Sequence, residues 1–204
     1  MAGNRSASRV VHSATECKFW LSKPPSVDDA RPARCPGCDG AGREVGRALM
    51  IVGHGRRDRQ QRGPQVADGT PVTLVVAIRR YRCRRCEAVL TVVPRDVAPR
   101  RHYSRPAIAL ALARLGLLGE PAATVRRAIS PWRVSATPGW RTLRRWTQAV
   151  REGRLFPTVA ASSATTIDRA LARRIAQVVM GHAPPTVRGT PVLAQVFAGA
   201  VAMA

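Results

Sequence analysis

The sequence has few acidic residues and almost no lysine. Its 204 residues include 12 Asp and Glu against 34 Lys and Arg, and Lys18 and Lys23 are the only lysines, so arginine carries the net charge of +22. A strong positive charge favours polyanionic partners, above all nucleic acid. The sequence also lacks a glycine-rich phosphate loop and a pair of carboxylates suited to acid–base chemistry, so we expect a protein that is not an enzyme.

Long hydrophobic runs are missing too. The longest, residues 192–204, is too short to cross a bilayer and contains Gln195. Residues 1–5 lead into a polar stretch without the apolar block of a signal peptide. We therefore expect a cytoplasmic, nucleoid-associated protein with no membrane partner.

Aromatic residues make up only 4% of the chain. Proteins that bind RNA often stack bases on exposed aromatic side chains. The aromatic residues near the basic segments have the spacing of core residues, which favours duplex DNA over RNA as the partner.

The positive charge is concentrated in two segments. Residues 43–105 have a net charge of +10 and residues 126–154 of +7, whereas residues 106–125 are neutral. A GC-rich coding sequence would also raise the arginine content without selecting a partner, but it would spread arginine more evenly. The distribution therefore indicates two contact surfaces.

Four of the five cysteines form two Cys-x-x-Cys pairs, Cys35/Cys38 and Cys83/Cys86. Two such turns supply four thiolates, which suit one tetrahedral, structural Zn²⁺ without an open position for catalysis. A redox pair normally occurs once beside a βαβ unit, and disulfides need an oxidising compartment. We expect Cys17 to be an ordinary semi-buried thiol and His54 not to be a ligand.

The residues between the two cysteine pairs predict a β-hairpin. Residues 49–52 and the β-branched residues 72–78 flank a turn at residues 68–71, and residues 88–93 form a third strand after the second pair. The hairpin would bring the cysteine pairs together. We therefore predict an α+β protein that begins with a small three-stranded zinc ribbon.

Helix-forming sequence follows the ribbon. Ser104 is a good N-cap for a helix that ends at Gly119, and a second, shorter helix spans residues 120–129. Residues 140–150 predict a third helix, with Leu143, Trp146 and Val150 facing inward and an arginine-rich outer face. Two helices around a turn at residues 135–138 are typical of a helix-turn-helix, although a solvated basic helix packed on the ribbon by its tryptophans is the alternative. The candidate DNA contacts are Arg56, Arg57, Arg59 and Arg62 in the hairpin, and Arg141, Arg144, Arg145 and Gln148 in the helix.

These patterns divide the chain into four parts. Residues 1–32 form a polar and partly disordered segment, residues 33–99 the ribbon, and residues 100–156 the helix-turn-helix-like domain. Residues 157–204 form C-terminal helices. Their apolar faces would close the helical domain or form the seam of a homodimer.

The two cysteine pairs, Gly55-Arg56-Arg57 and the Pro-rich exit after residue 93 resemble the zinc ribbon that precedes the helix-turn-helix of bacterial transposases, over residues 33–150. The resemblance implies a DNA-binding module for transposon ends, or a domesticated derivative.

The chain departs from those transposases after Arg151. Their catalytic domain uses three acidic residues to hold two metal ions, and here only Glu152 and Asp168 follow. We therefore expect a non-catalytic, zinc-containing protein that binds double-stranded DNA, with a homodimer or a separately encoded transposase catalytic subunit as partner. An RNA-binding or protein-complex adaptor is the alternative.

Overall fold

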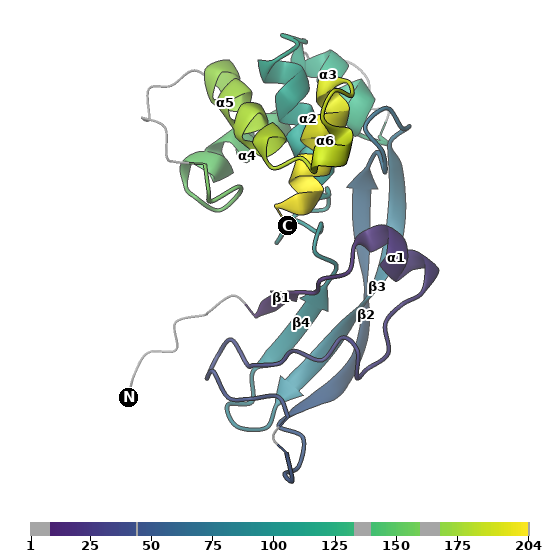
Figure 1. Ribbon diagram of the computed structural model, residues 1–204, viewed down its shortest axis with the longest axis vertical. Helices are drawn as coiled ribbons and strands as arrows, with labels where there is room; N and C mark the ends of the chain where they lie inside the picture. The colour runs from purple at the N-terminus through teal and green to yellow at the C-terminus, as the bar shows by residue number, and fades with distance from the viewer. Residues whose placement is uncertain (1–8, 44, 133–139, 160–167, 204) are drawn as a thin grey trace. The chain divides into compact units, whose positions relative to one another are not determined.

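The structure, a computed structural model, describes residues 9–43, 45–132, 140–159 and 168–203. Within these ranges the protein is a mixed α+β protein with a four-stranded sheet and six α-helices (Figure 1). It divides into two compact units. The first, here the ribbon unit, comprises Met1–Gln60 and Val75–Pro99, and the second, the helical unit, comprises Gln61–Leu74 and Arg100–Ala204. None of the helices in the described ranges has the length and apolarity needed to span a membrane.

The sheet has the order β1-β4-β3-β2. Strands occur near all three predicted positions, as β2 (Ile51–Gly63), β3 (Val72–Cys83) and β4 (Val89–Val93), but β2 shares only two residues with the predicted run 49–52 and continues through the arginines that follow it. The prediction of three strands is wrong in number, because β1 (Val10–His12) pairs in parallel with β4. A three-residue strand such as β1 is too short to show an alternation of apolar and polar residues. Its pairing partner, β4, lies about eighty residues away in the chain.

The N-terminal segment packs on the sheet from residue 9 onward. Helix α1 (Cys17–Ser22) buries Trp20, whose Nε1 donates to the carbonyl of Ala77 at 3.0 Å. Tyr81 in β3 donates its hydroxyl proton to the carbonyl of Val27 at 2.7 Å. The segment that the composition describes as polar and partly disordered thus contributes apolar anchors to the core of the ribbon unit.

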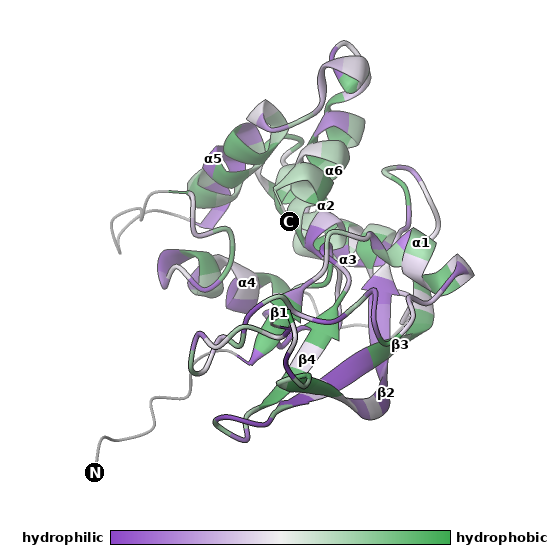
Figure 2. Ribbon diagram, turned by 60° about the horizontal axis from the view of Figure 1, so that its bottom comes forward, coloured by the Kyte–Doolittle hydropathy of each residue, from purple (hydrophilic) through white to green (hydrophobic). Residues whose placement is uncertain are grey.

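The helical unit is built around α2 (Arg105–Gly116), whose residues between Arg105 and Arg114 are all apolar, and Figure 2 shows hydrophobic residues in green on the helices of this unit. Residues 106–113 are all buried, as in a central core helix. Ser104 caps this helix as predicted, since its Oγ accepts the N–H of Ala107 at 3.2 Å. The other helices are α3 (Ala122–Ile129), α4 (Arg141–Arg151), α5 (Asp168–Gly181) and α6 (Val192–Ala202), with a short 3-10 turn at Pro185–Val187.

Helices α5 and α6 pack on α2 and on each other. The backbones of α2 and α5 approach so closely that a Cβ on Gly116 would lie 2.2 Å from the backbone nitrogen of Arg173. Helices α5 and α6 therefore close the helical unit within one chain, whereas the seam of a homodimer stays a prediction. The apolar face of α5 packs against both α2 and α6 of the same chain.

Helices α3 and α4 are the pair expected for a helix-turn-helix. Leu143, Trp146 and Val150 are buried, so the inward face of α4 is confirmed. The predicted turn at residues 135–138 lies outside the described residues, and the helix-turn-helix assignment stays a prediction.

The tip of the β2–β3 hairpin belongs to the helical unit. Gly63 has a φ of +117°, and a Cβ there would lie 2.4 Å from the Cβ of Ala107 on α2. Next to it, Arg62 donates its backbone N–H to the carbonyl of His102 at 2.6 Å and accepts the N–H of Ser104 at 3.3 Å. These bonds hold Arg62 against the segment that leads into α2.

Candidate metal centre and basic pocket

The four paired cysteines converge in the ribbon unit. Their sulfur atoms all lie within 4.8 Å of one another. The sulfurs of Cys35 and Cys86 are 3.6 Å apart, and those of Cys38 and Cys83 are 3.8 Å apart. A tetrahedral ion with metal–sulfur bonds of about 2.3 Å requires sulfur–sulfur edges of about 3.8 Å. The cluster therefore has the donors and the spacing to hold a metal ion.

The two Cys-x-x-Cys turns share one hydrogen-bond pattern. In each turn, the residue after the second cysteine donates its N–H to the carbonyl of the first cysteine, at 2.8 Å for Asp39 and 2.9 Å for Glu87. The first cysteine donates its N–H to the carbonyl two residues beyond the second cysteine, at 2.9 Å for Cys35 and 3.0 Å for Cys83. Both halves of the site thus have the same local backbone structure.

The flanking side chains repeat as well. The residue before the first cysteine pairs with the residue after the second, Arg34 with Asp39 at 2.9 Å and Arg82 with Glu87 at 2.8 Å. Both acidic residues have left-handed backbones, with φ of 54° and 60°. The shared pattern Arg-Cys-x-x-Cys-Asp/Glu is visible in the sequence, although it was not part of the prediction.

The protonation of the sulfurs differs within the cluster. Burial raises the pKa of Cys83, but N–H groups of Cys86 and Arg85 and the neighbouring thiols outweigh burial and lower the pKa to about 7. The N–H of Ala88 lowers the pKa of Cys86, but burial and the three other sulfurs raise it to about 12. Four adjacent thiolates repel one another, so a cation at their centre is what would stabilise them together.

The left-handed backbone at Glu87 gives a direct test of the turn geometry. Glu87→Val should lower the free energy of unfolding by about 1–2 kcal/mol relative to Glu87→Gly, because a Cβ in this region is strained and a β-branched one more so. Both variants remove the exposed ion pair with Arg82, so their difference isolates the backbone. Urea unfolding followed by the reactivity of the cysteines with a thiol reagent measures it. Equal stability of the two variants would contradict the assigned geometry.

Cys17 and His54 lie apart from the cluster. Cys17 is fully buried, not semi-buried as predicted, and burial together with nearby Asp96 raises its pKa to about 12. Asp96 accepts the backbone N–H of Cys17 at 2.8 Å, which ties α1 to the segment after β4. His54 is exposed on β2.

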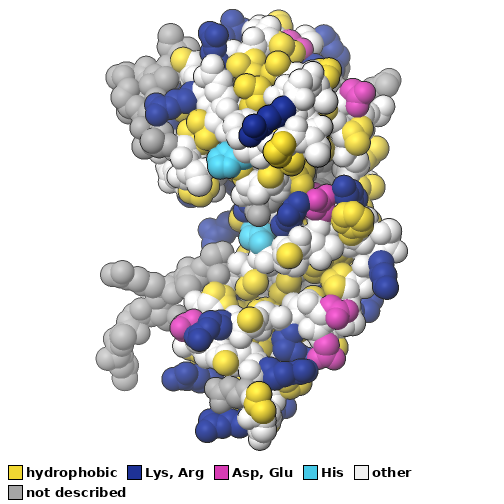
Figure 3. All heavy atoms as spheres, in the orientation of Figure 1, with side chains coloured by type: hydrophobic (Ala, Val, Ile, Leu, Met, Phe, Trp, Pro, Cys, Tyr) yellow, Lys and Arg dark blue, Asp and Glu magenta, His cyan; other side chains and the backbone are white. Residues whose placement is uncertain are grey.

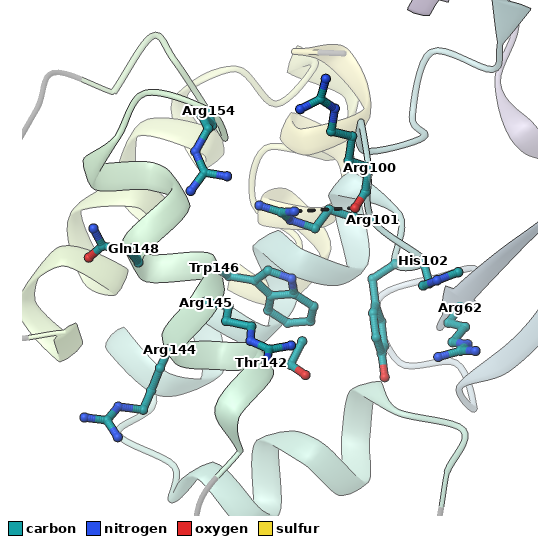
Figure 4. A pocket seen from close by; sticks show the side chains of 11 residues that line it. Arg62, Arg100, Arg101, His102, Thr142, Arg144, Arg145, Trp146, Gln148 and Arg154 are labelled. Atoms are coloured by element: carbon teal, nitrogen blue, oxygen red, sulfur yellow. Dashed lines mark hydrogen bonds between the residues drawn. The ribbon is translucent and has the colours of Figure 1, made fainter. Parts of the chain in front are cut away.

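A basic pocket of about 580 Å³ lies in the helical unit (Figure 4). It is formed by the hairpin tip, the segment before α2, the outer face of α4 and the loop after α4. None of the described residues that line it is acidic. Its basic lining comprises Arg62, Arg100, Arg101, His102, Arg144, Arg145 and Arg154.

An aromatic cluster lies next to the pocket, and two of its members, Tyr103 and Trp146, line it. The rings of Tyr103, Trp140 and Trp146 meet edge to face, with centroids 5.0–5.9 Å apart. Trp146, at the centre of the view in Figure 4, is buried and lines the pocket. Trp140, the N-cap residue of α4, and Trp146 thus pack against Tyr103 within the helical unit, so α4 is anchored by its buried aromatic side.

The charged side chains of the lining are all cationic. Burial lowers the pKa of Arg101, and nearby Arg154 lowers it further by repulsion. Glu152, which lies outside the lining, pairs with Arg154 and accepts a hydrogen bond from Gln148 at 2.9 Å. On the face drawn in Figure 3, Lys and Arg side chains are also more widespread than Asp and Glu. An anion in the pocket would relieve the repulsion among the arginines.

The pocket brings together four of the eight residues proposed from the sequence as DNA contacts: Arg62, Arg144, Arg145 and Gln148. Arg141 is exposed at the start of α4 but is not part of the lining.

The three other candidates lie on β2 in the ribbon unit. Arg56 and Arg57 are exposed there. Arg59 donates from Nη2 to the carbonyl of Ala98 at 2.9 Å, and burial and neighbouring Arg57 lower its pKa.

Four basic residues of the pocket are not among the contacts predicted from the sequence: Arg100, Arg101, His102 and Arg154. The run Arg-Arg-His-Tyr directly before the N-cap Ser104 is the available signal, because residues that precede a helix cap are held close to the helix start.

Comparisons with known proteins give one family. No curated protein and no solved structure matches the chain. A model of a domain of unknown function, DUF6431, matches residues 35–146. The match begins at the first cysteine of the cluster and ends at Trp146, so it includes both cysteine turns, the hairpin and helices α2 and α3. Because the match covers more than half of the chain, this protein belongs to the DUF6431 family.

Proposed function

We propose that this protein is a non-catalytic, zinc-containing DNA-binding protein. Four thiolates with tetrahedral spacing suit Zn²⁺ better than hard cations such as Mg²⁺, which prefer oxygen. With all four positions occupied by sulfur, the ion would have no open site for water and would serve to stabilise the ribbon unit.

The observation that carries the DNA-binding proposal is the convergence of six arginines on one pocket without an acidic residue in the lining. Guanidinium groups bind phosphate oxygens with paired N–H donors. Arg144 and Arg145 lie on the exposed face of α4, whereas Arg62 and Arg101 come from outside the helix, so the site can follow a backbone over more than one phosphate.

The test is binding of a duplex at increasing salt. If about six arginines neutralise phosphates, the logarithm of the binding constant should fall with the logarithm of salt concentration with a slope of about −5. A binding constant that does not depend on salt concentration, or no binding to any duplex, would contradict the proposal. Competition between duplex DNA and structured RNA distinguishes DNA binding from the RNA-binding or adaptor alternative. Stronger competition by structured RNA than by duplex DNA would favour that alternative.

We further infer a link to transposition, as a helper of a separately encoded catalytic subunit or as a domesticated derivative. The support is the resemblance of the cysteine turns and hairpin to transposase zinc ribbons. In the described residues, the cysteine cluster is the one group of three or more His, Cys, Asp or Glu placed to hold a metal ion. Robust DNA cleavage by the purified protein with Mg²⁺ or Mn²⁺ would contradict the non-catalytic part.

A further inference from the structure

One tryptophan in the helical unit is held on the surface. The side chain of Trp132 is 54% exposed, whereas those of Trp20, Trp140 and Trp146 are 1%, 7% and 1% exposed. A large aromatic ring left in water forfeits the stabilisation that burial gives the other three. This exposure makes Trp132 a candidate contact for a ligand.

Hydrogen bonds fix the position of this tryptophan. Its backbone N–H donates to the Oγ of Ser130 at 3.3 Å, and the same Oγ accepts the hydroxyl proton of Tyr103 at 2.9 Å. Tyr103 itself lines the basic pocket. Trp132 is thus connected to the pocket through a short chain of hydrogen bonds.

Arg62 contacts both the Trp132 ring and the pocket. Its guanidinium carbon lies 5.1 Å from the centroid of the Trp132 ring, in a cation–π contact, and the same side chain lines the pocket. An aromatic face beside a row of arginines is the arrangement by which proteins bind unpaired nucleotides, with the base stacked on the ring and the phosphates held by the cations.

We propose that Trp132 and the basic pocket form a binding site for an unpaired nucleotide at the end of a DNA duplex. The inference rests on the proposed DNA binding and extends it. A base inside a duplex is already stacked on both faces, so Trp132 can stack only on a base that has left the helix or extends beyond it. The pocket volume of about 580 Å³ is within the range of sites that hold small ligands such as nucleotides.

The test compares three forms of one short labelled duplex by fluorescence anisotropy with the full chain. The first is blunt, the second has a single-stranded extension, and the third has the same extension without its bases. The extension should raise the affinity about 5- to 10-fold, because base–aromatic stacking contributes about 1 kcal/mol or more. The extension without bases keeps the phosphates and should lose that gain.

Variants assign the gain to the ring. Trp132→Ala should bind the extended and blunt duplexes equally, with an unchanged salt dependence, and Trp132→Phe should keep most of the gain. Phe19→Ala is the matched control, since Phe19 is 56% exposed in the ribbon unit and has its own cation–π contact with Lys18.

The outcomes separate the two proposals. Salt-dependent binding of the blunt duplex without any gain from the extension, or a gain that survives Trp132→Ala, overturns the nucleotide site and leaves DNA binding intact. Failure of the full chain to bind any of the three forms overturns both.

Discussion

Replacing Cys83 with serine is expected to remove the metal ion and unfold the ribbon unit. Cys83 is one of four sulfurs within 4.8 Å of one another, and a serine hydroxyl is a poor ligand for a soft ion. The binding energy of a structural zinc ion in a small domain is about 10 kcal/mol or more, which is comparable with the whole stability of a domain. We expect metal analysis to find one zinc ion per chain in the parent protein and none in the variant.

The helical unit should survive this change. The core of α2, α5 and α6 contains none of the four cysteines, so the helical circular dichroism signal should persist while thiol reactivity and protease sensitivity of the ribbon unit rise. Cys17→Ala is the matched control, because Cys17 is a cysteine of the ribbon unit outside the cluster. Full zinc occupancy in the Cys83→Ser protein, or loss of zinc in the control, would contradict the assigned centre.

The double variant Arg144→Ala with Arg145→Ala is expected to lower the affinity for duplex DNA roughly 60-fold at 0.1 M salt. The estimate follows from the loss of two phosphate contacts, each with its released counterions, and it implies that the slope of the salt dependence becomes shallower by about 2. Both residues are exposed on α4, so their loss should leave the fold unchanged.

Arg173→Ala with Arg174→Ala is the matched control. These two residues are also adjacent, exposed arginines on a helix of the helical unit, and they lie outside the pocket lining. Loss of charge alone would weaken binding equally in both double variants. Equal effects would therefore contradict a specific role for the pocket, whereas a larger effect at Arg144 and Arg145 supports it.

Local sequence signals predicted most of the elements. These signals involve residues that are close together in the sequence. Examples are the β-branched run in β3, the Ser104 cap of α2, and the spacing of Leu143, Trp146 and Val150 on α4. Strand β1 was not predicted because its hydrogen bonds are made with β4, far along the chain. For the same reason the role of Trp20, which bonds to Ala77, had no local signal.

The sites divide in a similar way. The cysteine spacing predicted the cluster, because two thiolates with two residues between them already suit one ion. The basic pocket was predicted only in part. Arg62 is placed there by the contact of Gly63 with α2, and Arg101 by the path of the chain into Ser104.

The low aromatic content led the sequence analysis away from base stacking, yet a single well-placed ring suffices for one stacked base. Composition averages over the chain, whereas exposure is a property of one residue in the folded protein. Only the structure distinguishes Trp132 from the three buried tryptophans.

The sequence by itself determined the α+β class, the metal-binding donor set and the excess of arginine, since these depend on residue types and short spacings. The tertiary structure alone decided which arginines line one pocket and which tryptophan ring stays exposed to water. Charges cooperate only when side chains from distant segments come within a few ångströms of one another, and that proximity is set by packing around α2.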